Sequence, residues 1–225
     1  MFTGIIESLG TIKKIESGGE GKVLQIGCDL DLSETGIGDS IAVNGACLTA
    51  TSLDKQSFKV DMAPETVQRT TFRHLAIGSR VNIERALKLG GRLDGHLVSG
   101  HIDGTGTIVS IEKKSNALIL KIKVAAELGE DMIEKGSVAI EGISLTINQV
   151  SDRGSASEFQ VSIIPHTAAI TTIGLKQPGD EVNIETDMIG KYIKKIITKG
   201  SASKNDAGSQ KDTISMALLA QNGFL

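Results

Sequence analysis

Apolar and polar residues alternate over short segments along most of the chain. Residues 58–62, with the sequence FKVDM, alternate from one residue to the next, and this spacing predicts a strand with one buried face. Comparable segments in the first half predict strands at 10–15, 23–26, 40–43, 48–53, 58–62 and 80–85. The proline at position 64 predicts a short helix to about residue 69, and the polar segment 30–35 predicts a single helical turn.

The second half repeats this order of elements. Its pattern predicts strands at 107–111, 118–124, 137–140, 145–150, 159–163 and 182–185, with short helices at 125–130 and after Pro165. Six short strands in each half, joined mostly by hairpin-length connections, indicate a small closed barrel, because closure removes the exposed edges of a sheet. The predicted fold class is therefore all-β, with two homologous six-stranded barrels in tandem.

Beyond the second barrel the pattern changes to that of a helix. Five apolar residues recur at helical spacing and predict a C-terminal α-helix at 188–199: Ile189, Tyr192, Ile193, Ile196 and Ile197. The segment 200–225 begins with a polar stretch low in apolar residues. We expect residues 200–211 to be disordered, with a short amphipathic helix at 214–219 left open.

The two halves are copies of each other. The segment GACLT at 45–49 recurs as GISLT at 142–146, and VNIE at 81–84 recurs at 182–185. Gly4 matches Gly100 and Val81 matches Val182, so the displacement between the copies grows from 96 to 101 residues. The growth falls at the polar hairpin 151–157, which is longer in the second copy, because surface loops tolerate insertions that packed strands do not.

The duplication predicts the domain boundaries. Two copies of about 90 residues form two domains of one fold, because a solenoid needs three or more short repeats. We expect a first barrel at 1–86, a linker at 87–94, a second barrel at 95–187, the helix at 188–199 and the tail at 200–225.

Composition excludes several classes of partner. The net charge of −3, the pI near 5.8 and the 3% of aromatic residues do not provide the basic, aromatic surface that nucleic acids require. There is no run of about 20 apolar residues and no signal-peptide pattern at the N-terminus, so we expect a cytoplasmic protein without a membrane partner. Cys28 and Cys47 could form one disulfide or remain two thiols, and cytoplasmic placement favours thiols.

Several separated motifs together resemble the riboflavin synthase family of the alpha-subunit type. They are MFTGI at 1–5, the paired G-x-[C/S]-L-T segments, SGH at 99–101, and VNIE at 182–185 followed by Asp187. The resemblance covers roughly residues 1–197. It implies that the barrels have Greek-key topology and that the C-terminal helix assembles a homotrimer, in which the first barrel of one subunit faces the second barrel of its neighbour. Association with lumazine synthase is left open.

The resemblance also implies a reaction. Two molecules of 6,7-dimethyl-8-ribityllumazine undergo dismutation, in which one gives a four-carbon unit to the other, and riboflavin and 5-amino-6-ribitylamino-pyrimidinedione result. This is the last step of riboflavin biosynthesis, and it uses no metal and no redox cofactor. The sequence agrees, since it has no zinc-type Cys/His spacing, no Walker loop and no dinucleotide-binding glycine motif after a strand.

A duplicated fold suits a reaction between two identical molecules in different roles. If each barrel holds one lumazine, proximity alone can supply up to about 7–11 kcal/mol of the barrier. Residues that differ between the copies should then distinguish donor from acceptor. The differing pairs are Cys47 and Ser144, Ile5 and His101, and Glu65 and His166.

The paired motifs supply three candidate catalytic residues. Cys47 is either a small buried residue, as free cysteines often are, or a member of the substrate pocket, as the resemblance implies. In the pocket its role could be a polar contact, activation or covalent attack. Ser144 and Thr146 are either ordinary strand residues or, by resemblance, hydroxyls that contact the pteridine ring and stabilise charge while the 7-methyl group loses a proton.

Histidine is the natural acid or base for that proton. His101 is the strongest candidate, because it replaces Ile5 and matches a family active-site position, although a loop histidine is the alternative. His96 and His166 are weaker candidates, and His74 is expected in a solvated connection.

Asp187 and Lys135 each have two interpretations. Asp187 either stabilises the N-terminus of the last helix or reaches the active site, as the corresponding family residue does. Lys135 is either a solvent-facing turn residue or a donor in the pocket.

The ribityl chain requires several polar contacts. The resemblance places these further residues in the substrate pockets: Phe2, Thr3, Gly4, Ser40, Asp61, Thr66, Ile163 and Thr167. Two rival functions remain at this stage. A non-catalytic lumazine or flavin carrier would share the barrels but lose polar residues from one pocket, and a small-barrel module for oligonucleotides or sugars would need more aromatic residues.

Overall fold

The computed structural model describes residues 1–18 and 21–205 of the 225-residue chain. Residues 1–191 form one compact unit that contains both predicted barrels, and the remainder of the last helix belongs to a second unit. Among the described helices, none is both long enough and apolar enough to cross a membrane. The predicted short helix at 214–219 lies outside the described residues.

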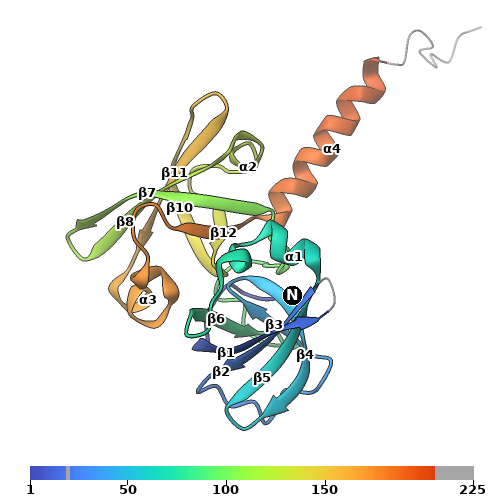
Figure 1. The fold of residues 1–225 in the computed structure, drawn as a ribbon. Coiled ribbons are helices and arrows are strands. Elements are labelled where there is room, and N and C mark those ends of the chain that lie inside the picture. Colours follow the sequence, from blue (N-terminus) through green and yellow to red (C-terminus); the bar gives the residue numbers. More distant parts are fainter. Residues whose placement is uncertain (19–20, 206–225) are drawn as a thin grey trace, which may run out of the picture. The chain divides into compact units, whose positions relative to one another are not determined.

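The first copy forms a closed six-stranded barrel (Figure 1). Its strands are β1 (Ser8–Gly18), β2 (Gly21–Gly27), β3 (Ser40–Val43), β4 (Ala46–Asp54), β5 (Ser57–Met62) and β6 (Arg80–Arg85). Helix α1 (Pro64–Arg69) and the 3-10 helix η1 (Thr71–His74) connect β5 to β6. Around the barrel the strands follow the order β1-β2-β5-β4-β3-β6, and all neighbours are antiparallel.

The second copy forms a closed barrel of the same topology. Its strands are β7 (Gly104–Lys114), β8 (Ala117–Ala125), β9 (Ser137–Ile140), β10 (Ile143–Asp152), β11 (Ala156–Ile163) and β12 (Glu181–Thr186). Helix α2 (Ala126–Gly129) follows β8, whereas α3 (Pro165–Ile170) and the 3-10 helix η2 (Thr172–Leu175) precede β12. The neighbours around this barrel are those of the first, with each strand number raised by six, which confirms the predicted tandem Greek-key barrels.

Each barrel has its own apolar core, because alternate residues of every strand point inward. Phe58, Val60 and Met62 of β5 are buried, and Phe159, Val161 and Ile163 repeat this pattern in β11. Both barrels also have β-bulges at equivalent places, in the first strand and in the fourth. Bulges increase the bending that a six-stranded sheet needs in order to close.

Two predicted elements require correction. Residues 30–35 form no helix, and a single turn with Thr35 N–H donating to Leu32 O (3.0 Å) stands in its place. Helix α4 (Met188–Asn205) is longer than the predicted 188–199, so the expected disorder from Gly200 onward is wrong for residues 200–205. One glycine in a helix costs only about 1 kcal/mol, and no proline follows it before Asn205.

Two short arms precede the barrels and connect them. The N-terminal arm (residues 2–5) lies against the middle arm (residues 98–101), since Phe2 N–H donates to Val98 O (2.7 Å) and Val98 N–H donates to Phe2 O (3.1 Å). Both side chains are fully buried against Ala42 of β3 and Ala139 of β9. The arms therefore fill the space between the outer faces of the two barrels.

Candidate active site

A buried glutamate anchors each arm to its own barrel. Glu84 of β6 accepts hydrogen bonds from the backbone N–H (2.6 Å) and hydroxyl (2.7 Å) of Thr3 and from Gly4 N–H (3.0 Å). Glu185 of β12 accepts the equivalent bonds from Ser99 (2.6 and 2.7 Å) and from Gly100 N–H (3.0 Å). Burial raises the pKa of both carboxyl groups, and the hydrogen bonds from the arms oppose that rise.

Each arm then crosses to the other barrel. Gly4 O accepts a hydrogen bond from Ser144 N–H in β10 (2.8 Å), and Gly100 O accepts one from Cys47 N–H in β4 (2.8 Å). A Cβ atom on Gly4 would lie 2.6 Å from Cβ of Ser144, and one on Gly100 would lie 2.5 Å from Cβ of Cys47. Both glycines also have positive φ, 77° and 84°, so the crossing requires glycine for two reasons.

This exchange of arms decides which predicted residues meet. His101 directly follows Gly100 and is exposed beside Cys47, on the first barrel, although the sequence assigns it to the second copy. Its counterpart Ile5 is exposed beside Ser144, on the second barrel. The strand residues that differ between the copies, Cys47 and Ser144, are therefore hydrogen-bonded to the glycines that precede the two differing arm residues.

The second barrel has a histidine of its own that the sequence ranked only as a weaker candidate. Nδ1 of His96 lies 2.7 Å from the hydroxyl of Ser144, and the backbone N–H of His96 donates to the backbone oxygen of Thr3 (3.1 Å). The residue His96 is 8% exposed, and Nε2 of its ring has no hydrogen-bond partner among the described residues. Burial lowers the pKa of His96, and the negative charge of Asp187 opposes the shift. Since His96 precedes the repeated segments, comparison of the copies could not identify it.

Asp187 caps the N-terminus of helix α4, which was one of its two interpretations from the sequence. Its Oδ1 accepts the N–H of Ile189 (2.9 Å) at the start of α4. Its influence on His96 also brings its charge into the neighbourhood of Ser144.

Polar side chains line the outer face of the first barrel. Ser40 of β3 pairs with Thr49 of β4, which pairs with Asp61 of β5, so these residues form a row across three strands. Their neighbours Leu48 and Ala50 point into the core. The row places two of the predicted substrate-binding residues, Ser40 and Asp61, on the same face.

The equivalent face of the second barrel holds Thr146, which is exposed on β10 and pairs with Ser137. Lys135 has a positive φ of 65° and donates its backbone N–H to Ile147 O (2.8 Å), as expected of the turn residue that was one of its two interpretations. Phe2 is fully buried between the barrels, where it supports the arms.

Two cavities occupy equivalent positions beside the short helices. A cavity of about 280 Å³ lies between the β7–β8 hairpin and α3 and is lined by Ile163, Pro165 and Ala168 among others. Its counterpart of about 390 Å³ lies between the β1–β2 hairpin and α1 and includes Pro64 and Val67. The predicted residues Thr66 and Thr167 belong to these same two helices, α1 and α3.

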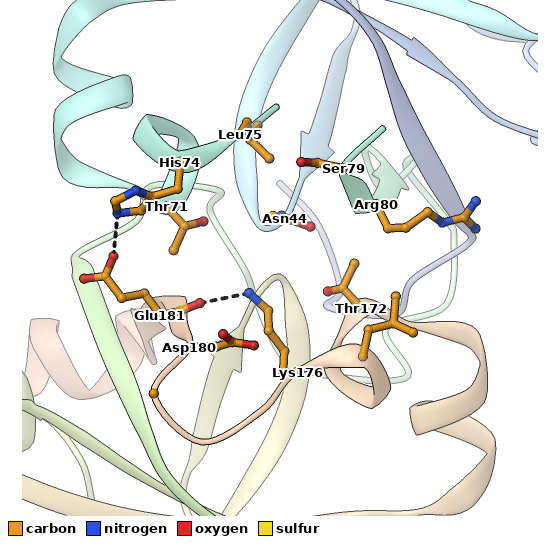
Figure 2. A pocket seen from close by; sticks show the side chains of 12 residues that line it. Asn44, Thr71, His74, Leu75, Ser79, Arg80, Thr172, Lys176, Asp180 and Glu181 are labelled. Atoms are coloured by element: carbon orange, nitrogen blue, oxygen red, sulfur yellow. Dashed lines mark hydrogen bonds and ion pairs between the residues drawn. The ribbon is translucent and has the colours of Figure 1, made fainter. Parts of the chain in front are cut away.

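Two larger depressions are also present. One of about 570 Å³ is lined by Thr3, Ser40 and Glu84 among others, so it adjoins the N-terminal arm. A groove of about 480 Å³ runs between η1 and η2, and no predicted site residue is among those that line it (Figure 2). The groove is therefore separate from the candidate active site.

Comparison with known proteins supports the duplication. The family model described as "Lumazine binding domain" matches residues 3–86 and 99–187. A riboflavin synthase of Bacillus subtilis is 44% identical over 224 residues, with all of both chains covered. A riboflavin synthase of Actinobacillus pleuropneumoniae is also 44% identical over both full lengths, and one of Saccharomyces cerevisiae is 40% identical over 92% of each chain.

Two solved structures share the fold. LumP complexed with 6,7-dimethyl-8-(1'-D-ribityl) lumazine has a TM-score of 0.71 and 26% identity, covering 83% of this chain and 99% of LumP. LumP complexed with riboflavin has a TM-score of 0.73 and 28% identity, with the same coverage. Both copies of the barrel, the glycine crossings and the similarity at 40–44% identity over 92–100% of the chain thus agree, and the chain belongs to the riboflavin synthase family.

Proposed function

We propose that the chain performs the riboflavin synthase reaction, the dismutation of two 6,7-dimethyl-8-ribityllumazine molecules, with the residues gathered at the two arm crossings. The observation that carries this assignment is the exchange of arms. In support of the proposal, the backbone of Cys47 is hydrogen-bonded to Gly100, the residue before His101, and on the other barrel His96 lies at hydrogen-bond distance from the Ser144 hydroxyl. No external oxidant is needed, because the four-carbon unit that one lumazine loses is the unit that the other gains.

The His96–Ser144 pair suits removal of a proton from the 7-methyl group of a bound lumazine. Because the pKa of His96 is lowered, the imidazole is neutral near pH 7 and can accept a proton. The Ser144 hydroxyl, at 2.7 Å from Nδ1, orients the ring and can stabilise negative charge that develops on the pteridine. The other ring nitrogen, Nε2, is buried and has no hydrogen-bond partner among the described residues.

The His101–Cys47 pair would serve the second lumazine. His101 is exposed and free of the burial that affects His96, so it can exchange protons with solvent during turnover. Cys47 is half-buried next to Gly100, within reach of a ligand on the outer face of the first barrel. We assign the polar row with Ser40 and Asp61 to the ribityl chain of this molecule.

The assignment has a direct test. Purified protein is mixed with 6,7-dimethyl-8-ribityllumazine alone, and riboflavin and the pyrimidinedione are quantified over time. We expect one of each product for every two lumazine molecules consumed. Binding of lumazine without any riboflavin would instead assign the chain to the non-catalytic carriers, the alternative left open by its similarity to LumP.

We also propose that the chain works as a homotrimer in which the first barrel of one subunit faces the second barrel of its neighbour. Apolar side chains that are more than half exposed along α4 support this assembly: Ile189, Tyr192, Ile193, Ile196 and Ile197. Burying such a side chain stabilises a contact by about 1.5–3 kcal/mol. Association with lumazine synthase and a cytoplasmic location remain expectations from the sequence.

Truncation after Lys191 tests the trimer. This end point keeps the ion pair between Lys191 and Asp103 (2.7 Å) and removes most of the apolar stripe. We expect folded monomers that bind lumazine and turn it over poorly, as measured by light scattering and by riboflavin formation. A truncated monomer with full activity would show that one chain contains a complete site.

A further inference from the structure

The two barrels meet at a second buried contact, formed by the turns that lead into β4 and β10. The first turn is Asn44-Gly45 and the second is Glu141-Gly142, and all four residues have φ between 43° and 83°, as a two-residue hairpin turn requires. A Cβ atom on Gly45 would lie 2.7 Å from the backbone N of Gly142, and the reverse distance is also 2.7 Å. The turns therefore touch backbone to backbone.

Two buried asparagines hold this contact together. Nδ2 of Asn82 in β6 donates to Glu141 O (2.9 Å), and Nδ2 of Asn183 in β12 donates to Asn44 O (2.9 Å). Their Oδ1 atoms accept backbone N–H groups from the 3-10 helix of the opposite barrel, at 2.7 and 2.8 Å. Asn82 of the first barrel and Asn183 of the second barrel therefore each bind the turn of the opposite barrel.

The turns differ in one side chain. Oδ1 of Asn44 accepts the N–H of Asn82 (2.7 Å), and Oε1 of Glu141 accepts the N–H of Asn183 (2.7 Å), so one oxygen has the same role in both copies. Glu141 has a second oxygen, Oε2, which is buried and makes no hydrogen bond to a described residue. This oxygen lies 3.7 Å from Nζ of Lys176.

Lys176 is also a difference between the copies. It follows η2 directly, and Leu75 occupies the same place after η1. Figure 2 shows Lys176 in the groove, with Nζ directed at the backbone oxygen of Glu181 (2.8 Å). The first copy therefore has Asn44 and Leu75 at the two positions where the second copy has Glu141 and Lys176.

The charged combination is energetically expensive. Glu141 is 0% exposed, and burial raises the pKa of its carboxyl group while the positive charge of Lys176 opposes the rise. Asn44 makes the same backbone contact without a buried charge. A buried ion pair adds little net stability over a neutral alternative, but loss of one partner is strongly unfavourable. The pair therefore serves to place the turn rather than to add stability.

We propose that Glu141 and Lys176 are positioning residues for the second half of the active site. By fixing the turn from which β10 starts, they hold Ser144, three residues further along, at hydrogen-bond distance from His96. Neither side chain touches the ligand in this role. The proposal rests on the proposed function, since it concerns the geometry of the His96–Ser144 pair.

The first copy supplies the substitutions that test the pair. Lys176→Leu, Glu141→Asn and the double variant are compared for kcat and KM per folded molecule, well below the melting temperature. We expect each single variant to lower kcat by about 10- to 100-fold with KM changed less than about twofold, because small displacements of catalytic groups have effects of that order. Lys176→Leu should be the worse, since it leaves the buried carboxyl unpaired. The double variant, which recreates the neutral pair of the first copy, should recover kcat to within about threefold.

Three further measurements complete the test. Lys14→Leu, which removes an exposed lysine paired with Glu16, is the matched control and should behave as wild type. If Lys176→Leu does not fold, Glu141→Gln removes the charge at nearly constant shape and should still lower kcat more than KM. Wild-type conversion of lumazine, measured in parallel, tests the proposed function separately. Single variants with wild-type kcat and only a lower melting temperature, or a double variant no better than Lys176→Leu, would overturn the proposal.

Discussion

At the two arm crossings the same backbone arrangement holds different side chains. At one crossing Gly100, followed by His101, contacts Cys47, whereas at the other Gly4, followed by Ile5, contacts Ser144. The glutamate anchors, the glycines and the hydrogen bonds to the strands are the same in both. The duplication has therefore preserved the backbone frame of the crossings, whereas the side chains held by that frame differ between the copies.

At the crossing around Gly4 the arm has Ile5 where the other arm has a histidine, and His96 supplies a histidine from a different segment. Ile5 cannot exchange a proton, but His96 reaches Ser144 from the segment before the middle arm. His101 is exposed, whereas His96 is buried at 8% exposure, so the two differ in their access to water. This difference suits a reaction in which one lumazine loses a proton in a protected site while the other accepts the four-carbon unit.

The largest expected effect comes from removing each histidine in turn. His96→Gln and His101→Gln should each lower kcat by about 10²- to 10⁴-fold, the usual contribution of a general acid or base, with lumazine affinity little changed. Stopped-flow turnover and fluorescence titration of the ligand measure the two quantities. If one variant stays within about threefold of wild type, only the other crossing handles the proton.

The second effect concerns the glycines of the crossings. Gly100→Ala and Gly4→Ala should each lower kcat by about 10²-fold, because the new Cβ would displace the arm from Cys47 or Ser144. Gly78→Ala is the matched control, since its φ of 92° is equally unusual but no described atom outside its immediate neighbours lies within 4 Å of the added Cβ. Equal losses of activity in all three variants would attribute the effect to backbone strain alone.

A smaller effect should appear with pH. Burial in the folded protein holds the pKa of His96 below its ordinary value of 6.5, so the unfolded chain binds the proton more readily. The stability that comes from neutral His96 is present above pH 6.5 and is lost as the pH falls through the lowered pKa. Turnover should decline over the same acidic range, by about tenfold, and His96→Gln should lack this acidic limb in both activity and thermal melting. An acidic limb that persists in that variant would belong to another group.

The smallest effect is expected for Cys47→Ser. If the thiol acts as a polar contact, a hydroxyl of similar size can replace it and kcat should remain within about threefold of wild type. The substitution gives the crossing at Gly100 the same side chain as the crossing at Gly4, where Ser144 occupies the equivalent position. A loss of more than about 10²-fold would instead indicate covalent attack by the thiol.

The sequence by itself determined the local structure and the duplication. Strands β3 and β6 begin and end where the pattern predicted, and both Pro-initiated helices are present, because alternation and proline placement report local burial directly. The matching motifs also predicted that both halves share one topology. Only weakly patterned segments were misjudged: residues 30–35 form a turn, and α4 continues past Gly200.

Only the tertiary structure decided which chemical groups meet. His96 and Ser144 are 48 residues apart, and Cys47 of the first copy is hydrogen-bonded to Gly100 of the second, the residue before His101, so no local pattern could pair these segments. The same holds for Glu141 and Lys176, which come from two separate segments of the second barrel. Periodicity encodes which face of an element is buried. The partners of a side chain follow from long-range packing, which here includes an exchange of arms that the order of residues along the chain does not reveal.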